Sequence, residues 1–155
     1  MSDVIFHPYN AVVNDIEDIH RWCGSTSFAP DVIVGISRGG VFPAIHLSHK
    51  FNKPLEVLKW STRDFEERDH LKWVDMVVSS TEGRKFLIVE DIVDSGKTMR
   101  EMFSTIAEYS QHDLKNIKTV SLWFNTSQTE FVNDYYCHPI SRNDDKRWIV
   151  FPWET

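Results

Sequence analysis

Short apolar runs and amphipathic segments alternate along most of the chain. Four runs, at residues 31–36, 55–60, 86–91 and 117–124, are predicted to be strands, and residues 86–89 form a continuous apolar run of the length expected for a strand that is buried on both faces. Strands that alternate with helices form parallel sheets with right-handed crossovers. The pattern therefore predicts an α/β fold with a central, mostly parallel sheet flanked by helices.

Helical periodicity is clearest in two of the connecting segments. Residues 10–23 and 98–110 place apolar side chains at the i, i+3, i+4 and i+7 spacing of a helix. A third helix is expected after Gly40, with Pro43 in its first turn. Residues 72–78 are instead expected to pair as a further strand. The chain of 155 residues then forms a single domain.

The most informative stretch is residues 86–98, which read FLIVEDIVDSGKT. Glu90 and Asp91 end its apolar run, and two adjacent anions there are costly unless a ligand needs them. Residues 94–98 form a turn that opens a helix, and backbone N–H groups in that position bind phosphate. Because carboxylates repel phosphate, the acidic pair suits sugar hydroxyls or a divalent cation. Together these subsites describe a binding site for a ribose 5-phosphate.

This strand–turn–helix resembles the phosphoribosyl-pyrophosphate (PRPP) motif of the type I phosphoribosyltransferases. Their pattern is four apolar residues, two acidic ones, two apolar ones and then D-[ST]-G-x-T. A Walker P-loop needs an upstream glycine that Gly96 and Lys97 lack, and a Rossmann fingerprint needs three spaced glycines. The resemblance implies the type I phosphoribosyltransferase fold, with a core at about residues 10–136. A small C-terminal hood is expected at about 137–155, with a possible N-terminal contribution.

The resemblance also implies a role for each part of the motif. Glu90 and Asp91 are expected to hold the ribose hydroxyls and Mg²⁺, directly or through water. Asp94 is expected to lie beside the base and to accept a proton at N7. The 5-phosphate is expected to be bound by Asp94, Ser95, Gly96, Lys97 and Thr98.

A second loop, with the sequence S-R-G-G, follows the first strand. Its glycines allow the backbone to approach a ligand closely, and Arg38 offers a forked cation for phosphate oxygens. The loop resembles the pyrophosphate loop of the purine enzymes in this family. The resemblance implies that Ser37, Arg38 and Gly39 bind pyrophosphate, and that the Ser37–Arg38 peptide is cis.

Residues 61–71 are charged and irregular, which is typical of a solvated loop. Their position matches the mobile loop that closes over PRPP in family members and excludes water from the reaction centre. Arg68 and Lys72 are the candidates in this region for reaching pyrophosphate.

The C-terminal residues 148–154, WIVFPWE, are rich in aromatic side chains that could simply close the core. The pattern W-I-x-x-P-W-[DE] also resembles the base-binding hood of bacterial and archaeal xanthine–guanine phosphoribosyltransferases. That resemblance implies that Trp148 lies against the purine face and that groups around Ile149 and Glu154 read the base edge. The chain departs from the family at Asn125, where the 6-oxopurine enzymes carry a lysine that donates to O6. Asn125 therefore leaves the identity of the base open.

Charge and composition narrow the class of partner. The net charge of −6 argues against nucleic acid, and no apolar run approaches the roughly 20 residues of a membrane span. A signal peptide is not recognisable, and the two cysteines lack metal or redox spacing, so a cytoplasmic protein is expected.

The sequence thus predicts a Mg²⁺-dependent phosphoribosyltransferase of purine salvage. Its substrates would be PRPP and guanine, xanthine or hypoxanthine, and the family suggests a homo-dimer or tetramer. Two alternatives stay open: a PRPP- or nucleotide-binding regulator on the same fold, and a transferase for adenine or a pyrimidine. A receiver-like acidic metal pocket would not explain the S-R-G-G loop or the C-terminal tryptophans.

Overall fold

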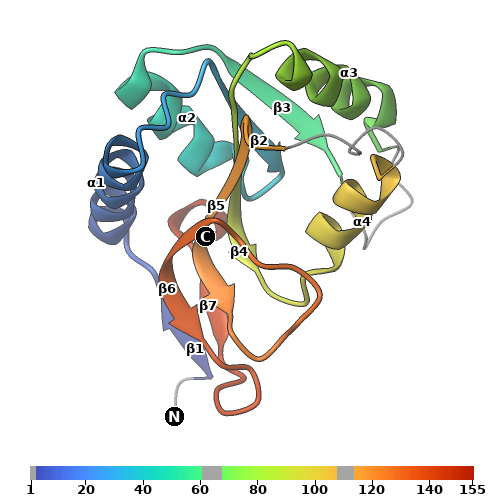
Figure 1. Cartoon of the computed structure of the whole chain (residues 1–155). Helices are drawn as coiled ribbons and strands as arrows, with labels where there is room; N and C mark the ends of the chain where they lie inside the picture. The colour runs from blue at the N-terminus through green and yellow to red at the C-terminus, as the bar shows by residue number, and fades with distance from the viewer. Residues whose placement is uncertain (1–2, 61–67, 108–113) are drawn as a thin grey trace.

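The computed structural model describes residues 3–60, 68–107 and 114–155, and in these it shows an α/β fold around a five-stranded parallel sheet (Figure 1). The strand order is β3-β2-β4-β5-β6, so that β4 is central. In register, Val89 of β4 lies between Gly35 of β2 and Val120 of β5. The strands are β2 (Val32–Ser37), β3 (Leu55–Lys59), β4 (Phe86–Val93), β5 (Ile117–Asn125) and β6 (Tyr135–Ile140).

Helices cover both faces of this sheet. The helices α1 (Tyr9–Ser25) and α2 (Val41–Phe51) pack on one face, and α3 (His70–Thr81) and α4 (Lys97–Thr105) pack on the other (Figure 1). Successive β4 residues alternate between the two cores: Ile88 joins the α3–α4 core, whereas Leu87 and Val89 join the α1–α2 core. Because both faces are covered, the central strands read as continuous apolar runs.

A separate two-stranded parallel sheet joins the two ends of the chain. It pairs β1 (Val4–Phe6) with β7 (Trp148–Val150), and the short 3₁₀ helix η1 (Pro152–Glu154) follows. The backbone N–H of His7 continues the pairing by donating to the carbonyl of Val150 (2.9 Å). We call this sheet, together with residues 151–155, the hood.

The expectation of a strand at residues 72–78 is wrong, because this segment belongs to α3. Its buried side chains follow the helical period, and the indole N–H of Trp73 donates to the carbonyl of Met102 on α4 (2.7 Å). Helix α4 ends at Thr105, and residues 108–110 of the expected helix lie outside the described residues. Within the described ranges, no helix has the length and apolar character needed to cross a membrane. The buried residues of α3 are Trp73, Met76, Val77 and Ser80.

Candidate active site

A pocket of about 730 Å³ opens at the carboxyl ends of β2 and β4, and the hood forms its other wall. Four segments line it: the loop after β2, the end of β4, the turn that opens α4, and the C-terminal residues. The structure brings most of the expected site residues into this lining, but not Arg68, Lys72 or Asn125. Those that it does bring together are Ser37, Arg38, Gly39, Glu90, Asp91, residues 94–98, Trp148, Ile149 and Glu154.

The loop after β2 packs directly against the acidic pair. A Cβ atom at Gly39 would overlap the carboxylate of Asp91, so that only glycine allows this approach. One oxygen of the same carboxylate accepts the backbone N–H of Ile92 (2.7 Å). The peptide between Ser37 and Arg38 is cis, as the resemblance implied.

The acidic pair is suited to a hard cation. Burial, together with the neighbouring negative charge of Asp91, raises the pKa of the Glu90 carboxyl well above its ordinary value. Two adjacent carboxylates that line one pocket concentrate negative charge, which a divalent cation would neutralise. Carboxylate oxygens are the ligands that Mg²⁺ prefers in proteins. Glu90 and Asp91 therefore fit a magnesium ion, whether bound directly or through water.

The turn at residues 94–98 presents the start of α4 to the pocket. Gly96 adopts a left-handed conformation (φ 78°), which a residue without a side chain reaches at no steric cost, and α4 begins at Lys97. The Ser95 hydroxyl accepts the backbone N–H of Lys97 (3.2 Å). The leading N–H groups of a helix have no partner within the helix and carry the positive end of its dipole. This turn can therefore bind an anion.

A stack of three aromatic rings forms the opposite wall. Trp153 lies parallel to Phe42 of α2 and to Phe151, with ring centroids 5.2 and 4.9 Å away. Trp148 also lines the pocket and is 49% exposed. We call the stacked rings the aromatic wall. No local sequence pattern could have revealed that Phe42 belongs to the aromatic wall, since it contacts Trp153 only in the folded chain.

A guanidinium that no sequence motif identifies also lines the pocket. Arg142, on the turn between β6 and β7, donates from Nε to Asp94 Oδ1 (3.0 Å) and from Nη2 to Asp94 Oδ2 (3.3 Å). The side chain of Asn125 lies behind this pair and is buried. Its Nδ2 donates to the Asp94 carbonyl (2.9 Å), and its Oδ1 accepts the backbone N–H of Arg142 (3.0 Å). Asn125 thus holds Asp94 and Arg142 in place, although it does not itself line the pocket.

Arg68 and Lys72 have partners elsewhere. The guanidinium of Arg68 forms an ion pair with Glu101 of α4. The ammonium of Lys72 donates to the Val57 carbonyl (2.7 Å) and pairs with Glu56 of β3 (3.1 Å). Residues 61–67 of the expected mobile loop lie outside the described residues.

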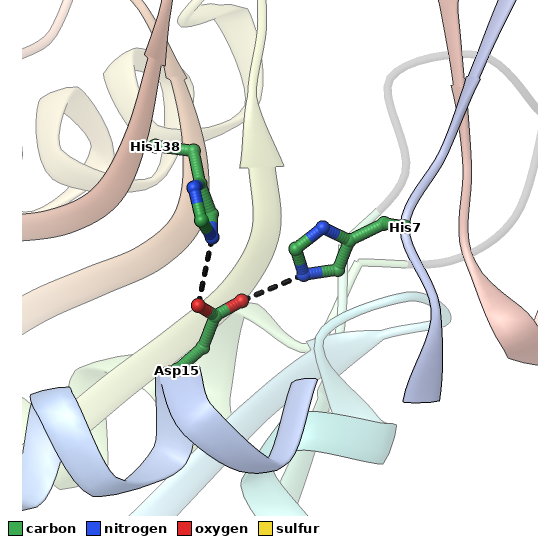
Figure 2. Close-up of side chains that lie close together, drawn as sticks. All are labelled: His7, Asp15 and His138. Atoms are coloured by element: carbon green, nitrogen blue, oxygen red, sulfur yellow. Dashed lines mark hydrogen bonds and ion pairs between the residues drawn. The ribbon is translucent and has the colours of Figure 1, made fainter. Parts of the chain in front are cut away.

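A cluster of the buried His7 and Asp15 with the partly exposed His138 ties the hood to the core (Figure 2). The two Asp15 oxygens each contact one histidine Nε2 at 2.7 Å, and the His7 ring packs edge-on against Phe151 of the aromatic wall. Burial acts to raise the pKa of Asp15, but the hydrogen bonds from His138 and His7 hold it below its usual value. The cluster thus supports the aromatic wall from behind.

These three residues have the composition of a metal site, since their ligand atoms all lie within 4.8 Å of one another. The indole N–H of Trp123, however, can only donate, and it points to Nδ1 of His7 (3.3 Å). His7 therefore carries its proton on Nε2 and donates it to Asp15. Because Nε2 of His7 is protonated, it has no lone pair to offer a metal ion. The cluster instead links the residue after β1 to α1 and β6 by hydrogen bonds.

Comparison with known proteins agrees with this geometry. The family model of the phosphoribosyl transferase domain matches residues 6–155. The xanthine-guanine phosphoribosyltransferase of Idiomarina loihiensis is 31% identical over 124 residues, which cover 79% of this chain and 70% of the relative. The corresponding protein of Gluconobacter oxydans is 26% identical over 127 residues, covering 79% of this chain and 68% of that protein.

Solved structures show the same architecture. The purine phosphoribosyltransferase from Pyrococcus horikoshii superposes with a TM-score of 0.71 and is 26% identical, over 99% of this chain and 95% of that one. The five-stranded parallel sheet with helices on both faces therefore matches the fold of a phosphoribosyltransferase structure. The chain belongs to the type I phosphoribosyltransferases, a family of enzymes.

Proposed function

We propose that the protein transfers the 5-phosphoribosyl group of PRPP to a 6-oxopurine and releases pyrophosphate, as in purine salvage. One observation carries the proposal: a single pocket joins the S-R-G-G loop, the acidic pair, the turn at 94–98 and an aromatic wall. Phosphate, sugar and planar base would each meet a group suited to it. The similarity to the purine enzymes of Pyrococcus horikoshii and Idiomarina loihiensis supports a purine as the acceptor.

The reaction breaks the C1′–O bond to pyrophosphate and forms a C1′–N9 bond to the base. Positive charge develops on the ribose ring, and Glu90 and Asp91 would favour it electrostatically. Magnesium, when bound by this pair, supplies positive charge that neutralises the leaving pyrophosphate. Arg38 and the backbone of residues 37–39 would hold the pyrophosphate oxygens.

The remaining groups of the pocket would orient the 5-phosphate of PRPP and the purine base. The N–H groups of the turn at 94–98 would hold the 5-phosphate. The Asp94 carboxylate would accept the proton from N7 of the base as N9 attacks C1′. Trp148 would lie against the purine face.

A screen of acceptor bases tests the proposal. The protein is incubated with PRPP, Mg²⁺ and one of guanine, hypoxanthine, xanthine, adenine or uracil, and pyrophosphate release is measured. We expect release with at least one 6-oxopurine. Protein that binds Mg·PRPP but releases no pyrophosphate with any base would be a PRPP-binding regulator instead.

Asp91→Asn tests the assignment of the sugar site. Both Mg·PRPP affinity and turnover are expected to fall by at least tenfold, because one carboxylate of the pair becomes neutral, while the melting temperature stays close to that of wild type. Asp75→Asn, which makes the same change at an exposed position of α3, is the matched control. Calorimetric titration with Mg·PRPP decides, and unchanged affinity in Asp91→Asn would contradict the sugar site.

A further inference from the structure

The guanidinium of Arg142 lines the pocket beside Asp94, on the turn that leads into strand β7 of the hood. Its side chain is 18% exposed, so that it is largely enclosed while still lining the pocket. Two surface arginines, Arg100 and Arg147, pair with acidic residues outside this lining. Arg142 is therefore placed for contact with a bound ligand.

Contacts from several sides fix the guanidinium in one orientation. Its Nε and one Nη2 hydrogen bind the Asp94 carboxylate, and Nη1 donates to the carbonyls of Asp145 and Arg147. An arginine has five N–H groups, and these contacts use one at Nε, two at Nη1 and one at Nη2. Within the part of the chain that the structure describes, one Nη2 hydrogen is left to donate to a ligand.

Asp94 and Arg142 together present an acceptor beside a donor. A 6-oxopurine that reacts at N9 carries its proton on N7, next to the acceptor O6 on the same edge of the ring. This edge matches the pair: N7–H would donate to the Asp94 carboxylate, and O6 would accept from Arg142 Nη2. A 6-aminopurine offers a donor at both places.

We propose that Arg142 is the residue that selects the base by the atom at C6, an inference that rests on the proposed transferase function. Arginine stays protonated and can only donate, so an amino group at C6 would leave two N–H groups facing each other. A site built to hydrogen-bond one substrate group rejects the analogue that cannot pair with it. Asn125 is then a positioning residue, since it holds Arg142 and Asp94 without touching the base.

The test compares hypoxanthine with adenine, which carry different atoms at C6. At saturating Mg·PRPP, the ratio of kcat/KM for hypoxanthine to that for adenine is measured in wild type and in Arg142→Gln. The amide is neutral, and its oxygen can turn to accept from an amino group. We expect the ratio to fall by at least tenfold, while the dissociation constant of Mg·PRPP stays within twofold of wild type. Arg142→Met, which removes every donor, is the second variant and should also lower the ratio.

Arg147→Gln is the matched control, because it makes the same change on the same turn at an exposed side chain outside the pocket. Its ratio is expected to equal that of wild type. An unchanged ratio in a folded Arg142 variant that still releases pyrophosphate overturns the role of Arg142 and leaves the transferase function standing. Wild-type protein that uses adenine as efficiently as hypoxanthine also overturns it, without any variant. Failure of wild type to release pyrophosphate with every base overturns both proposals.

Discussion

The two halves of the pocket are built in different ways. The phosphate half is formed by two short stretches of consecutive residues, the end of β4 with the turn at 94–98 and the loop after β2, which follow neighbouring strands of the sheet. The base half collects Phe42 from α2, Arg142 from the turn before β7, and Trp148, Phe151 and Trp153 from the C-terminus. A contiguous motif can be recognised as a pattern of letters, whereas a wall assembled from distant segments exists only in the folded chain.

The supports of the two halves differ as well. The phosphate half rests on β4, whose residues Leu87 to Val89 are fully buried between two layers of helices. The base half rests on the hood, which the cluster of His7, Asp15 and His138 joins to the core. Changes in the phosphate half should therefore alter PRPP binding alone, and changes in the base half should alter base binding alone.

Asp94 lies where the halves meet, and its loss should give the largest effect. Asp94→Asn removes the proposed proton acceptor, and loss of a general base typically lowers turnover by about 10²–10⁴-fold. Mg·PRPP affinity should change little, because the backbone N–H groups of the turn remain. Single-turnover kinetics with the preferred 6-oxopurine and calorimetry with Mg·PRPP measure the two quantities.

Glu130→Gln neutralises an exposed carboxylate that pairs with Arg100 outside the pocket, and it should leave both quantities unchanged. Near-normal turnover in Asp94→Asn would mean that Asp94 only anchors Arg142. A parallel loss of Mg·PRPP affinity would show that the two halves do not act separately at this residue.

The sequence was sufficient for four of the five strands of the main sheet because their signals are local, but it did not identify β6, whose side chains are mostly half-buried. The runs at 31–36, 86–91 and 117–124 are mostly apolar since each strand is covered on both faces, and all three became strands. The segment at 72–78 was misjudged because a short apolar stretch fits either period. The buried Trp73, Met76 and Val77 stand at the i, i+3 and i+4 spacing of a helix, and the buried Ser80 continues this spacing beyond that segment.

The prediction of site residues from the sequence succeeded and failed for a similar reason. The PRPP motif and the S-R-G-G loop were recognised because consecutive backbone and side-chain groups bind one ligand. Asn125 was expected to face the base from its position at a strand end, yet its side chain is held by Asp94, Ser127 and Arg142. The ion pair between Arg142 and Asp94 joins residues that are 48 positions apart, which no local pattern could reveal.

Asp15→Asn tests the support of the base half. The amide would turn a donor toward one of the two histidine N–H groups, and a hydrogen bond to a charged group contributes about 1.5–3 kcal/mol. We expect a loss of that size in the free energy of unfolding at pH 7 and a higher KM for the base, with Mg·PRPP affinity unchanged. Asp18→Asn, which alters an exposed carboxylate of the same helix, should cost less than about 1 kcal/mol.

The same pair of proteins gives a pH test with a definite sign. The folded-state pKa of Asp15 lies below the unfolded value, so its contribution is complete above about pH 5 and is lost as the pH falls through the folded value. The stability gap between wild type and Asp15→Asn should therefore narrow below about pH 4. Urea unfolding at pH 7, 5, 4 and 3 measures this gap, and a constant gap would contradict the ionised cluster.

Gly39→Ala should give the smallest effect, confined to the phosphate half. The added Cβ would overlap the Asp91 carboxylate, so the acidic pair or the pyrophosphate loop must shift. We expect Mg·PRPP affinity to fall about tenfold, equivalent to about 1.4 kcal/mol, while the ratio of hypoxanthine to adenine use stays constant. Gly24→Ala in α1 is the matched control, since its Cβ would meet nothing within 4 Å and should slightly stabilise the helix. A changed base ratio in Gly39→Ala would show that the pyrophosphate loop and the base half are coupled through Asp91 and Asp94.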